Sequence, residues 1–220
     1  FTIPHNATDD YVLQFARLTK QTLNSSRKVY VEYSNELWNG IPTFTQIDHV
    51  QERGLALGLD SNPTKAGRYY TAKRSAEIFK IFEDEFGSEK YRVVKIIGGH
   101  WSDDDVLIDI IDALKNSTIN GVPVNPFGIN ATAIAISPYV GNGIGEDLVS
   151  EGVVSTETID QIIERLNNTA GTAIHSTIRI SLLQQHKTLA DNNNLRIVTY
   201  EGGQHLIPGS ANQGNTVLVQ

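Results

Sequence analysis

KVYVEYSNELWN, residues 28–39, is the stretch that decides the fold expected for this chain. Its first half alternates β-branched or aromatic side chains with other residues, a pattern that predicts a β-strand. The strand delivers Glu36 at its C-terminal end. A second strand of the same kind, Leu195–Tyr200, is followed directly by Glu201. The rest of the chain can be interpreted as the scaffold that brings Glu36 and Glu201 together.

The composition is that of a globular chain without metal or cofactor motifs. With 220 residues, 40% of them apolar and 20% charged, a single domain over residues 1–220 is the default expectation. The net charge of −7 argues against a nucleic acid partner, because phosphate binding requires a cationic surface. Cysteine is absent and the histidines lack the spacing of metal ligands, so no metal and no cofactor are expected. No run of apolar residues reaches the roughly 18 of a membrane span.

Two features favour an exported protein, located outside the cell or on its surface. Cysteine and methionine are both absent, which suits an oxidising environment. The chain also contains five Asn-x-Ser/Thr sequons, which become glycosylation sites if the protein is exported. The sequon asparagines are Asn6, Asn24, Asn116, Asn130 and Asn167.

Helical and extended patterns alternate along the chain, and no hairpin turn is expected between the strands. The expected strands cover part of 1–6, then 28–34, 91–97, 133–136 and 195–200, and the expected helices cover 8–24, 44–57, 69–86, 103–114, 156–166 and 173–190. Near-continuous apolar strands are buried on both faces, as in a parallel α/β sheet covered by helices. A doubly wound sheet and a (β/α)8 barrel both fit this order. The glycines in 141–145 lack the spacing of a dinucleotide-binding loop, which disfavours a nucleotide-binding enzyme.

Three of the expected helices carry an apolar stripe that should face the core. The stripe of 8–24 contains Tyr11, Phe15, Leu18 and Thr22, that of 69–86 contains Ala72, Ala76, Phe79, Phe82 and Phe86, and that of 156–166 contains Ile159, Ile162, Ile163 and Leu166. Gly87 is expected to end the helix 69–86, and Ser102 or Asp103 is expected to cap the helix that runs to 114.

The polar candidates for a site follow the expected strands. In a parallel α/β barrel the C-terminal ends of the strands meet at one face, where active sites are built. Cleavage of a glycosidic bond with retention requires two carboxyl groups about 5–5.5 Å apart, one to protonate the leaving oxygen and one to attack the anomeric carbon. Crowding by a second carboxylate and apolar walls would raise the pKa of the acid toward neutrality. Glu36 and Glu201 are the two candidates.

The same residues carry a family resemblance. Asn35-Glu36 after one strand and Glu201 after a later one resemble the large clan of retaining glycoside hydrolases with glutamates on strands four and seven of a (β/α)8 barrel. The resemblance implies that Glu36 is the acid/base and Glu201 the nucleophile, that Asn35 binds the 2-hydroxyl of the substrate, and that Tyr139 touches the nucleophile. YSNELWN together with YEGGQHL resembles segments of uncharacterised bacterial barrel proteins that are often associated with carbohydrate-binding modules.

Four further side chains complete the candidate substrate site. Trp38 and Trp101 can stack on sugar rings and favour a poly- or oligosaccharide, while His100 and His205 can line the pocket. The acidic run 103–105 is better explained as a helix N-terminus than as a metal site, because negative charge there meets the helix dipole.

The resemblance also has a consequence for the extent of the barrel. If Glu36 ends strand four, the chain starts near the end of strand three, and the tail 209–220 is short for strand eight and its helix. We therefore expect a partial barrel, with the remainder supplied by the same longer chain or by another chain.

A second function remains open beside the hydrolase. The sequons and the long connection 40–67 also suit a non-catalytic surface protein that keeps the barrel as a carbohydrate-binding or structural module. Covalent labelling of Glu201 by a mechanism-based sugar would distinguish the enzyme from the module.

Overall fold

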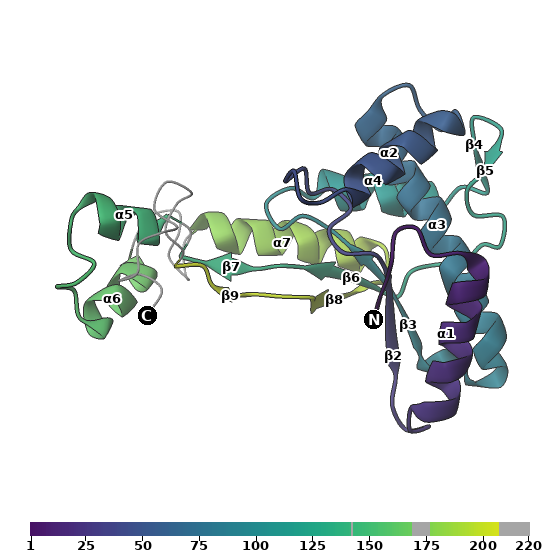
Figure 1. The fold of residues 1–220 in the computed structure, drawn as a ribbon, viewed down its shortest axis with the longest axis horizontal. Coiled ribbons are helices and arrows are strands. Elements are labelled where there is room, and N and C mark those ends of the chain that lie inside the picture. Colours follow the sequence, from purple (N-terminus) through teal and green to yellow (C-terminus); the bar gives the residue numbers. More distant parts are fainter. Residues whose placement is uncertain (142, 169–176, 207–220) are drawn as a thin grey trace. The chain divides into compact units, whose positions relative to one another are not determined.

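The computed structural model describes residues 1–141, 143–168 and 177–206, which form seven α-helices and nine strands. They divide into two compact units. The N-terminal unit comprises residues 1–136 and 189–198, and the C-terminal unit comprises 137–188 and 199–220. The elements, labelled in Figure 1, are β1 (Thr2–Ile3), α1 (Asp9–Thr22), β2 (Val29–Tyr33), α2 (Gln46–Ala56), α3 (Pro63–Phe86), the 3-10 helix η1 (Gly87–Arg92), β3 (Val93–Gly98), α4 (Asp105–Leu114), β4 (Thr118–Ile119), β5 (Val122–Pro123), β6 (Ala133–Ile136), β7 (Tyr139–Val140), α5 (Ile144–Ser150), α6 (Ile159–Asn168), α7 (Thr177–Asn192), β8 (Arg196–Thr199) and β9 (Gly203–Gln204).

A five-stranded parallel sheet organises the N-terminal unit, and its strand order is β1-β2-β3-β6-β8. β1 pairs with β2, β2 with β3 and β3 with β6, all in parallel, with Val31 opposite Lys95 and Ile97 opposite Ile134. Each strand of this sheet therefore neighbours the strand that precedes it along the chain. The predicted α/β class with a parallel sheet is confirmed.

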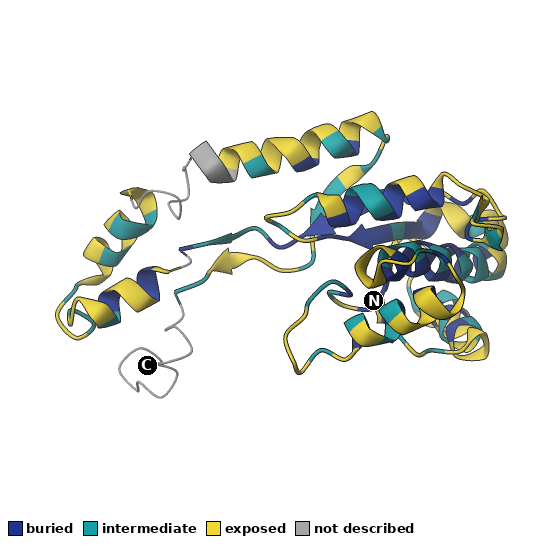
Figure 2. Cartoon of the chain, turned by 90° about the horizontal axis from the view of Figure 1, so that it is seen from above, coloured by how far each residue is buried: buried dark blue, intermediate teal, exposed yellow. Residues whose placement is uncertain are grey.

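One face of the sheet and helix α3 form the core. Val29, Val31 and Tyr33 of β2 are each at most 3% exposed and belong to the same apolar cluster as the inward side of α3. α3 also packs against α1, α2 and α4, so it lies at the centre of the helices of this unit (Figure 1). Figure 2 shows the buried residues of this unit concentrated on the strands and on the adjoining helices. The predicted buried residues of α3 are confirmed, and they are Ala72, Ala76, Phe79, Phe82 and Phe86.

The ends of the helices follow local capping rules, but two details differ from expectation. Helix α3 begins at Pro63, six residues earlier than predicted, because the side chain of Asn62 accepts a hydrogen bond from the backbone N–H of Lys65 and caps the first turn. The acidic run does begin a helix, but the N-cap of α4 is Asp104 rather than Ser102 or Asp103. Gly87 ends α3 with a φ of 57°, as the sequence indicates.

The prediction that the chain has no hairpin is wrong. β4 and β5 pair antiparallel through Asn120-Gly121, whose φ angles of 49° and 79° match the two-residue turn that Asn-Gly favours. The side chain of Asn120 also donates to the carbonyl oxygen of Leu59 at 2.9 Å, which ties the hairpin to the segment between α2 and α3. The hairpin lies in the connection between α4 and β6 and leaves the parallel order of the sheet intact.

The C-terminal unit has its own small sheet. β7 pairs in parallel with β9, with Tyr139 opposite Gly203. Helix α6 was expected from a stripe of apolar residues, and it forms, but none of its described residues is buried and Ile159 is 75% exposed. The expected start of the last helix at 173 and the tail 209–220 lie outside the described residues.

Candidate functional site

The loop after β2 holds Glu36 in an unusual backbone conformation. Ser34 and Glu36 have φ angles of 58° and 45°, in the left-handed region that side chains other than glycine rarely adopt. Such conformations cost of the order of 1–3 kcal/mol each and persist only where the surrounding structure holds them. Two of them within three residues direct the chain sharply out of the strand. They make this loop the strongest candidate for a functional site in the N-terminal unit.

Hydrogen bonds fix the position of the Glu36 carboxyl group. The side-chain amide of Asn39 donates to Oε2 of Glu36 at 2.7 Å, and its oxygen accepts from the backbone N–H of Ile41 at 3.0 Å. The side chain of Gln46, on α2, donates to the carbonyl oxygen of Asn35 at 3.0 Å. Leu37 anchors the loop in the core at 5% exposure. Asn39 is therefore a positioning residue for Glu36.

A second carboxyl group, Glu32, lies close to this loop. Glu32 points to the face of β2 opposite Val31 and is only 7% exposed. Its pKa is raised to about 8, chiefly by burial, and the negative charge of Glu36 acts in the same direction. The Glu32 carboxyl group is therefore neutral at pH values below about 8.

Gly98, the last residue of β3, makes room for this buried acid. A Cβ atom at residue 98 would lie 2.1 Å from Oε1 of Glu32 and 3.1 Å from Cη2 of Trp38. Real side chains do not approach that closely, so only glycine fits between the acid and the indole. Gly98, two residues before the candidate His100, therefore allows the close packing of β2 against β3.

Replacement of Glu32 by glutamine is expected to change the pH dependence of stability. The pKa of Glu32 is above its unfolded value of 4.5, so between pH 4.5 and about 8 the folded state keeps a proton that the unfolded state has lost. This contribution to the free energy of unfolding is full below pH 4.5 and falls as the pH rises to 8, by up to about 1.4 kcal/mol per pH unit. Glu32→Gln mimics the protonated form and should remove the part of the pH dependence of stability that Glu32 causes.

The measurement is urea unfolding of the wild type and of Glu32→Gln at pH 5, 6.5 and 8. Between pH 5 and 8, the free energy of unfolding of the variant should rise by a few kcal/mol relative to that of the wild type. Glu52→Gln, at an exposed position on α2, is the matched control, and its free energy of unfolding should change with pH as that of the wild type does. A constant difference between wild type and Glu32→Gln at all three pH values would contradict the buried neutral acid.

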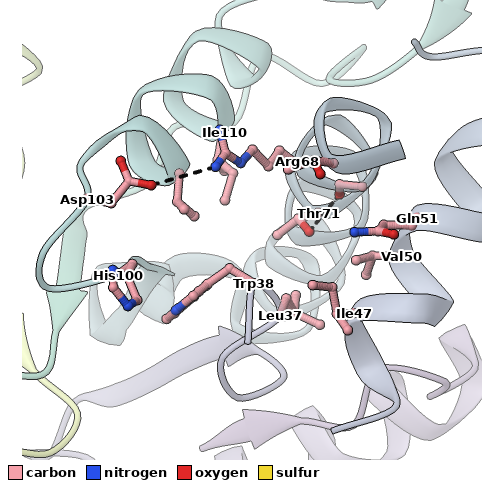
Figure 3. Close-up of a pocket in the computed structure, with 13 residues that line it drawn as sticks. Leu37, Trp38, Ile47, Val50, Gln51, Arg68, Thr71, His100, Asp103 and Ile110 are labelled. Carbon is pink, nitrogen blue, oxygen red and sulfur yellow. Dashed lines mark hydrogen bonds and ion pairs between the residues drawn. The ribbon is translucent and has the colours of Figure 1, made fainter. Parts of the chain in front are cut away.

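The loop after β3 carries the next two candidates. His100 is exposed, its Nδ1 lies 3.1 Å from Oγ of Ser102, and it forms a β-bridge with Asp103. His100 and Trp38 line the same pocket, which lies beside the Glu36 loop (Figure 3). Trp101 is partly buried and packs against the apolar core.

The remaining candidates gather in the C-terminal unit. The rings of Tyr139 and His205 are 5.0 Å apart at an angle of 59°, and β9, which precedes His205, pairs with β7, which contains Tyr139. Glu201 is exposed and precedes β9. The hydroxyl of Tyr200 donates to Oγ of Ser137 at 2.9 Å. This cluster joins the segment after β6 to the segment after β8.

The structure thus collects the predicted residues into two groups. Trp38 and His100 share a pocket in the N-terminal unit near Glu36, whereas Tyr139 and His205 contact each other near Glu201 in the C-terminal unit. The pairing of Glu36 with Glu201 stays a prediction. Sequence reasoning missed three residues near the first group, which are Glu32, Asn39 and Arg68. A glutamate at an alternating position inside an apolar strand was the available signal for Glu32.

One cluster of possible metal ligands exists among the described residues. The carboxylates of Asp103, Asp104 and Asp105 each offer an oxygen within 4.8 Å of the others. Asp105 opens helix α4, where negative charge is favoured by the helix dipole. Asp103 also faces Arg68 and accepts a hydrogen bond from the backbone N–H of Asp105. These contacts account for the acidic run at the start of the helix.

Two general properties accompany the site. The five sequon asparagines are all exposed, as a glycosylation site requires. Within the described ranges, none of the helices has the length and hydropathy needed to cross a bilayer. Comparison of the chain with protein-family models, with curated proteins and with solved structures found no match.

Proposed function

We propose that the chain belongs to the (β/α)8 barrel of a retaining glycoside hydrolase that cleaves poly- or oligosaccharides. Glu36 is the general acid and base, and Glu201 is the nucleophile. Asn35, Trp38, His100, Trp101, Tyr139 and His205 are the proposed substrate-binding residues. The strand order of the sheet is the observation that carries this proposal.

In a (β/α)8 barrel every strand pairs with the strand that precedes it, whereas a doubly wound sheet reverses its strand order near the middle. The order β1-β2-β3-β6-β8 contains no reversal. β3 and β6 stand between β2, which precedes Glu36, and β8, which precedes Glu201. Two strands also separate strands four and seven of a barrel, so the order supports the assignment of β2 and β8 to these positions.

The backbone of Glu36 gives independent support. Active sites of such barrels are built from residues at the C-terminal ends of the strands. Glu36 lies three residues beyond the end of β2, in a left-handed conformation, with its carboxyl group held by Asn39. Strain of this kind is typical of residues whose position serves chemistry.

The proposed reaction has two steps. In the first, a carboxylate oxygen of Glu201 bonds to the anomeric carbon while the glycosidic bond breaks, and the proton of Glu36 passes to the leaving oxygen. In the second, water attacks the same carbon and gives its proton to Glu36, and the ester to Glu201 breaks. The configuration of the anomeric carbon is inverted twice and so retained.

Covalent trapping tests this proposal. A panel of 2-deoxy-2-fluoro glycosides with a dinitrophenolate leaving group should label the intact protein once, releasing one dinitrophenolate per chain. Peptide mapping by mass spectrometry should place the ester on Glu201, and Glu201→Gln should not be labelled. Labelling at another residue would overturn the assignment.

The non-catalytic module is the alternative outcome. Binding of a glycan without hydrolysis and without labelling would replace the hydrolase by a carbohydrate-binding surface protein. Both forms of the proposal place the protein outside the cell or on its surface. All five sequon asparagines are exposed, so they would be accessible to glycosylation in an exported protein.

A further inference from the structure

A pocket of about 250 Å³ opens beside the loop that carries Glu36, entirely within the N-terminal unit. Its walls come from the loops after β2 and β3, from α2, and from the first turns of α3 and α4, as Figure 3 shows. The volume is below the 300–1,000 Å³ typical of sites for drug-sized ligands, so the pocket suits a ligand of about one ring. The polar and aromatic residues that line it include Trp38, Gln51, Thr64, Arg68, His100 and Asp103.

The pocket has an apolar floor and a polar rim. Leu37, Val50, Val106 and Ile110 line it and are each at most 5% exposed. Figure 3 shows Trp38 and His100 on one side and the Arg68–Asp103 pair on the other. A purely apolar ligand would cover the charged pair without replacing its hydration, which is costly. The lining therefore favours a ligand with one apolar face and polar edges.

The geometry of the charged pair favours hydroxyl groups. Nη1 of Arg68 donates to Asp109 at 2.7 Å, while Nη2 of Arg68 stands 3.9 Å from Oδ2 of Asp103, which is too far for a hydrogen bond. A hydroxyl between the two groups can accept from Arg68 and donate to Asp103 at the same time. A sugar ring carries several neighbouring hydroxyls that can make these two hydrogen bonds.

The charge of the pocket excludes acidic sugars. Among the described residues that line the pocket, Arg68 is the only lysine or arginine, and two carboxylates, Asp103 and Asp109, already face it. Lys65, on the same helix as Arg68, contacts the ring of Tyr69 instead of the pocket. A carboxylate or sulfate on the ligand would thus meet a negative excess, increased by the nearby Glu36. An uncharged ring meets no such penalty.

We propose that this pocket is a subsite for one uncharged pyranose ring of the substrate, stacked on Trp38 and bonded through its hydroxyls to Arg68, Asp103 and Gln51. The proposal rests on the glycoside hydrolase function above and narrows its substrate to neutral glycans. Because Trp38 lies two residues after Glu36, the subsite adjoins the bond to be cleaved.

A variant that closes the pocket tests the subsite. Thr64 is exposed, lines the pocket and is the second residue of α3, so Thr64→Trp should obstruct the entrance without altering the core. Thr188→Trp, at an exposed helical threonine of the C-terminal unit, is the matched control. Gln51→Leu removes one hydrogen-bonding group at similar volume. All three are made in the intact chain carrying Glu201→Gln, so that bound sugar is not consumed.

Calorimetric titrations use neutral trisaccharides of glucose, mannose, xylose and galactose, with trigalacturonate as the acidic probe. At least one neutral trisaccharide should bind, with affinity lowered at least tenfold by Thr64→Trp, about three- to tenfold by Gln51→Leu, and unchanged by Thr188→Trp. Trigalacturonate should not bind. Three results would each overturn the subsite. They are tighter binding of trigalacturonate than of the neutral trisaccharides, binding of a neutral trisaccharide that Thr64→Trp leaves unchanged, and the absence of all binding.

Activity separates this inference from the proposed function. Hydrolysis of a neutral glycan with a KM unaffected by Thr64→Trp would keep the hydrolase and overturn the subsite. Binding that depends on Thr64, in a protein that neither hydrolyses nor is labelled, would keep the subsite and overturn the hydrolase.

Discussion

Glu36→Gln is expected to lower turnover of a natural glycan by about 10²–10⁴-fold, the usual contribution of a positioned general acid. The amide of glutamine cannot give a proton to the leaving oxygen or take one from water. The loop should keep its shape, because Asn39 donates to Oε2 of Glu36 and glutamine can present its own oxygen to the same amide. The measurement is the kcat of hydrolysis beside the circular dichroism spectrum of the variant.

The leaving group and an added nucleophile distinguish an acid/base role from a structural one. A dinitrophenyl glycoside needs no acid, so Glu36→Gln should still release a burst of dinitrophenolate and then slow at the second step. Azide needs no base, and it should restore steady turnover and give a glycosyl azide of retained configuration. Glu52→Gln is the control and should behave as the wild type. If azide left the rate unchanged, Glu36 would not be the base.

Arg92→Met is expected to destabilise the fold by about 3 kcal/mol, since removal of one partner from a buried charged network leaves the others unpaired. Arg92 is 2% exposed and is the last residue of η1, directly before β3. It donates to the backbone carbonyl oxygens of Leu23, Asn24 and Arg27 at 2.9–3.1 Å and pairs with Glu89 at 2.6 Å. One guanidinium thus holds the turn that leads from α1 to β2.

The measurement is the midpoint of urea unfolding, which reports stability as long as the m-value, the dependence of the unfolding free energy on urea, is the same in all variants. Arg17→Met is the matched control, because the Arg17–Glu85 pair is 3.1 Å long but Arg17 is 47% exposed, and exposed pairs contribute about 0–1 kcal/mol. Arg92→Lys should recover little of the loss, since an ammonium group cannot reach all three carbonyls in a fixed plane. Equal effects of Arg92→Met and Arg17→Met would refute the role given to Arg92.

The fold could be predicted where local pattern and burial agree. The alternation in β2 and the apolar stripe of α3 were sufficient, because both elements bury the residues that their periods select. In α1 the period was recognised but the buried face was not. Tyr11 and Leu18 were expected inside and are 48% and 56% exposed, whereas the smaller Val12 and Ala16 face α3. Close helix packing selected small side chains over large ones.

The candidate site was predictable only in part. Glu36, Trp38 and His100 follow strands, and strand ends can be recognised in the sequence. Arg68 could not be identified in the same way, because it enters the pocket from the start of α3, a turn that was predicted as loop. Nor does the sequence show that Glu32 lies against Gly98, since that contact depends on the register of two strands.

The order of the sheet has a consequence for how the chain emerges from the ribosome. Each strand pairs with the one synthesised before it, so pairing can advance in the direction of translation, with a single growing edge. β6 is that edge while residues 137–195 are made, which takes several seconds at roughly 5–20 residues per second. The residues of β6, AIAI, carry no charge or proline that would discourage pairing with another chain. Nascent chains are therefore most vulnerable to aggregation after β6 has appeared and before β8 covers it.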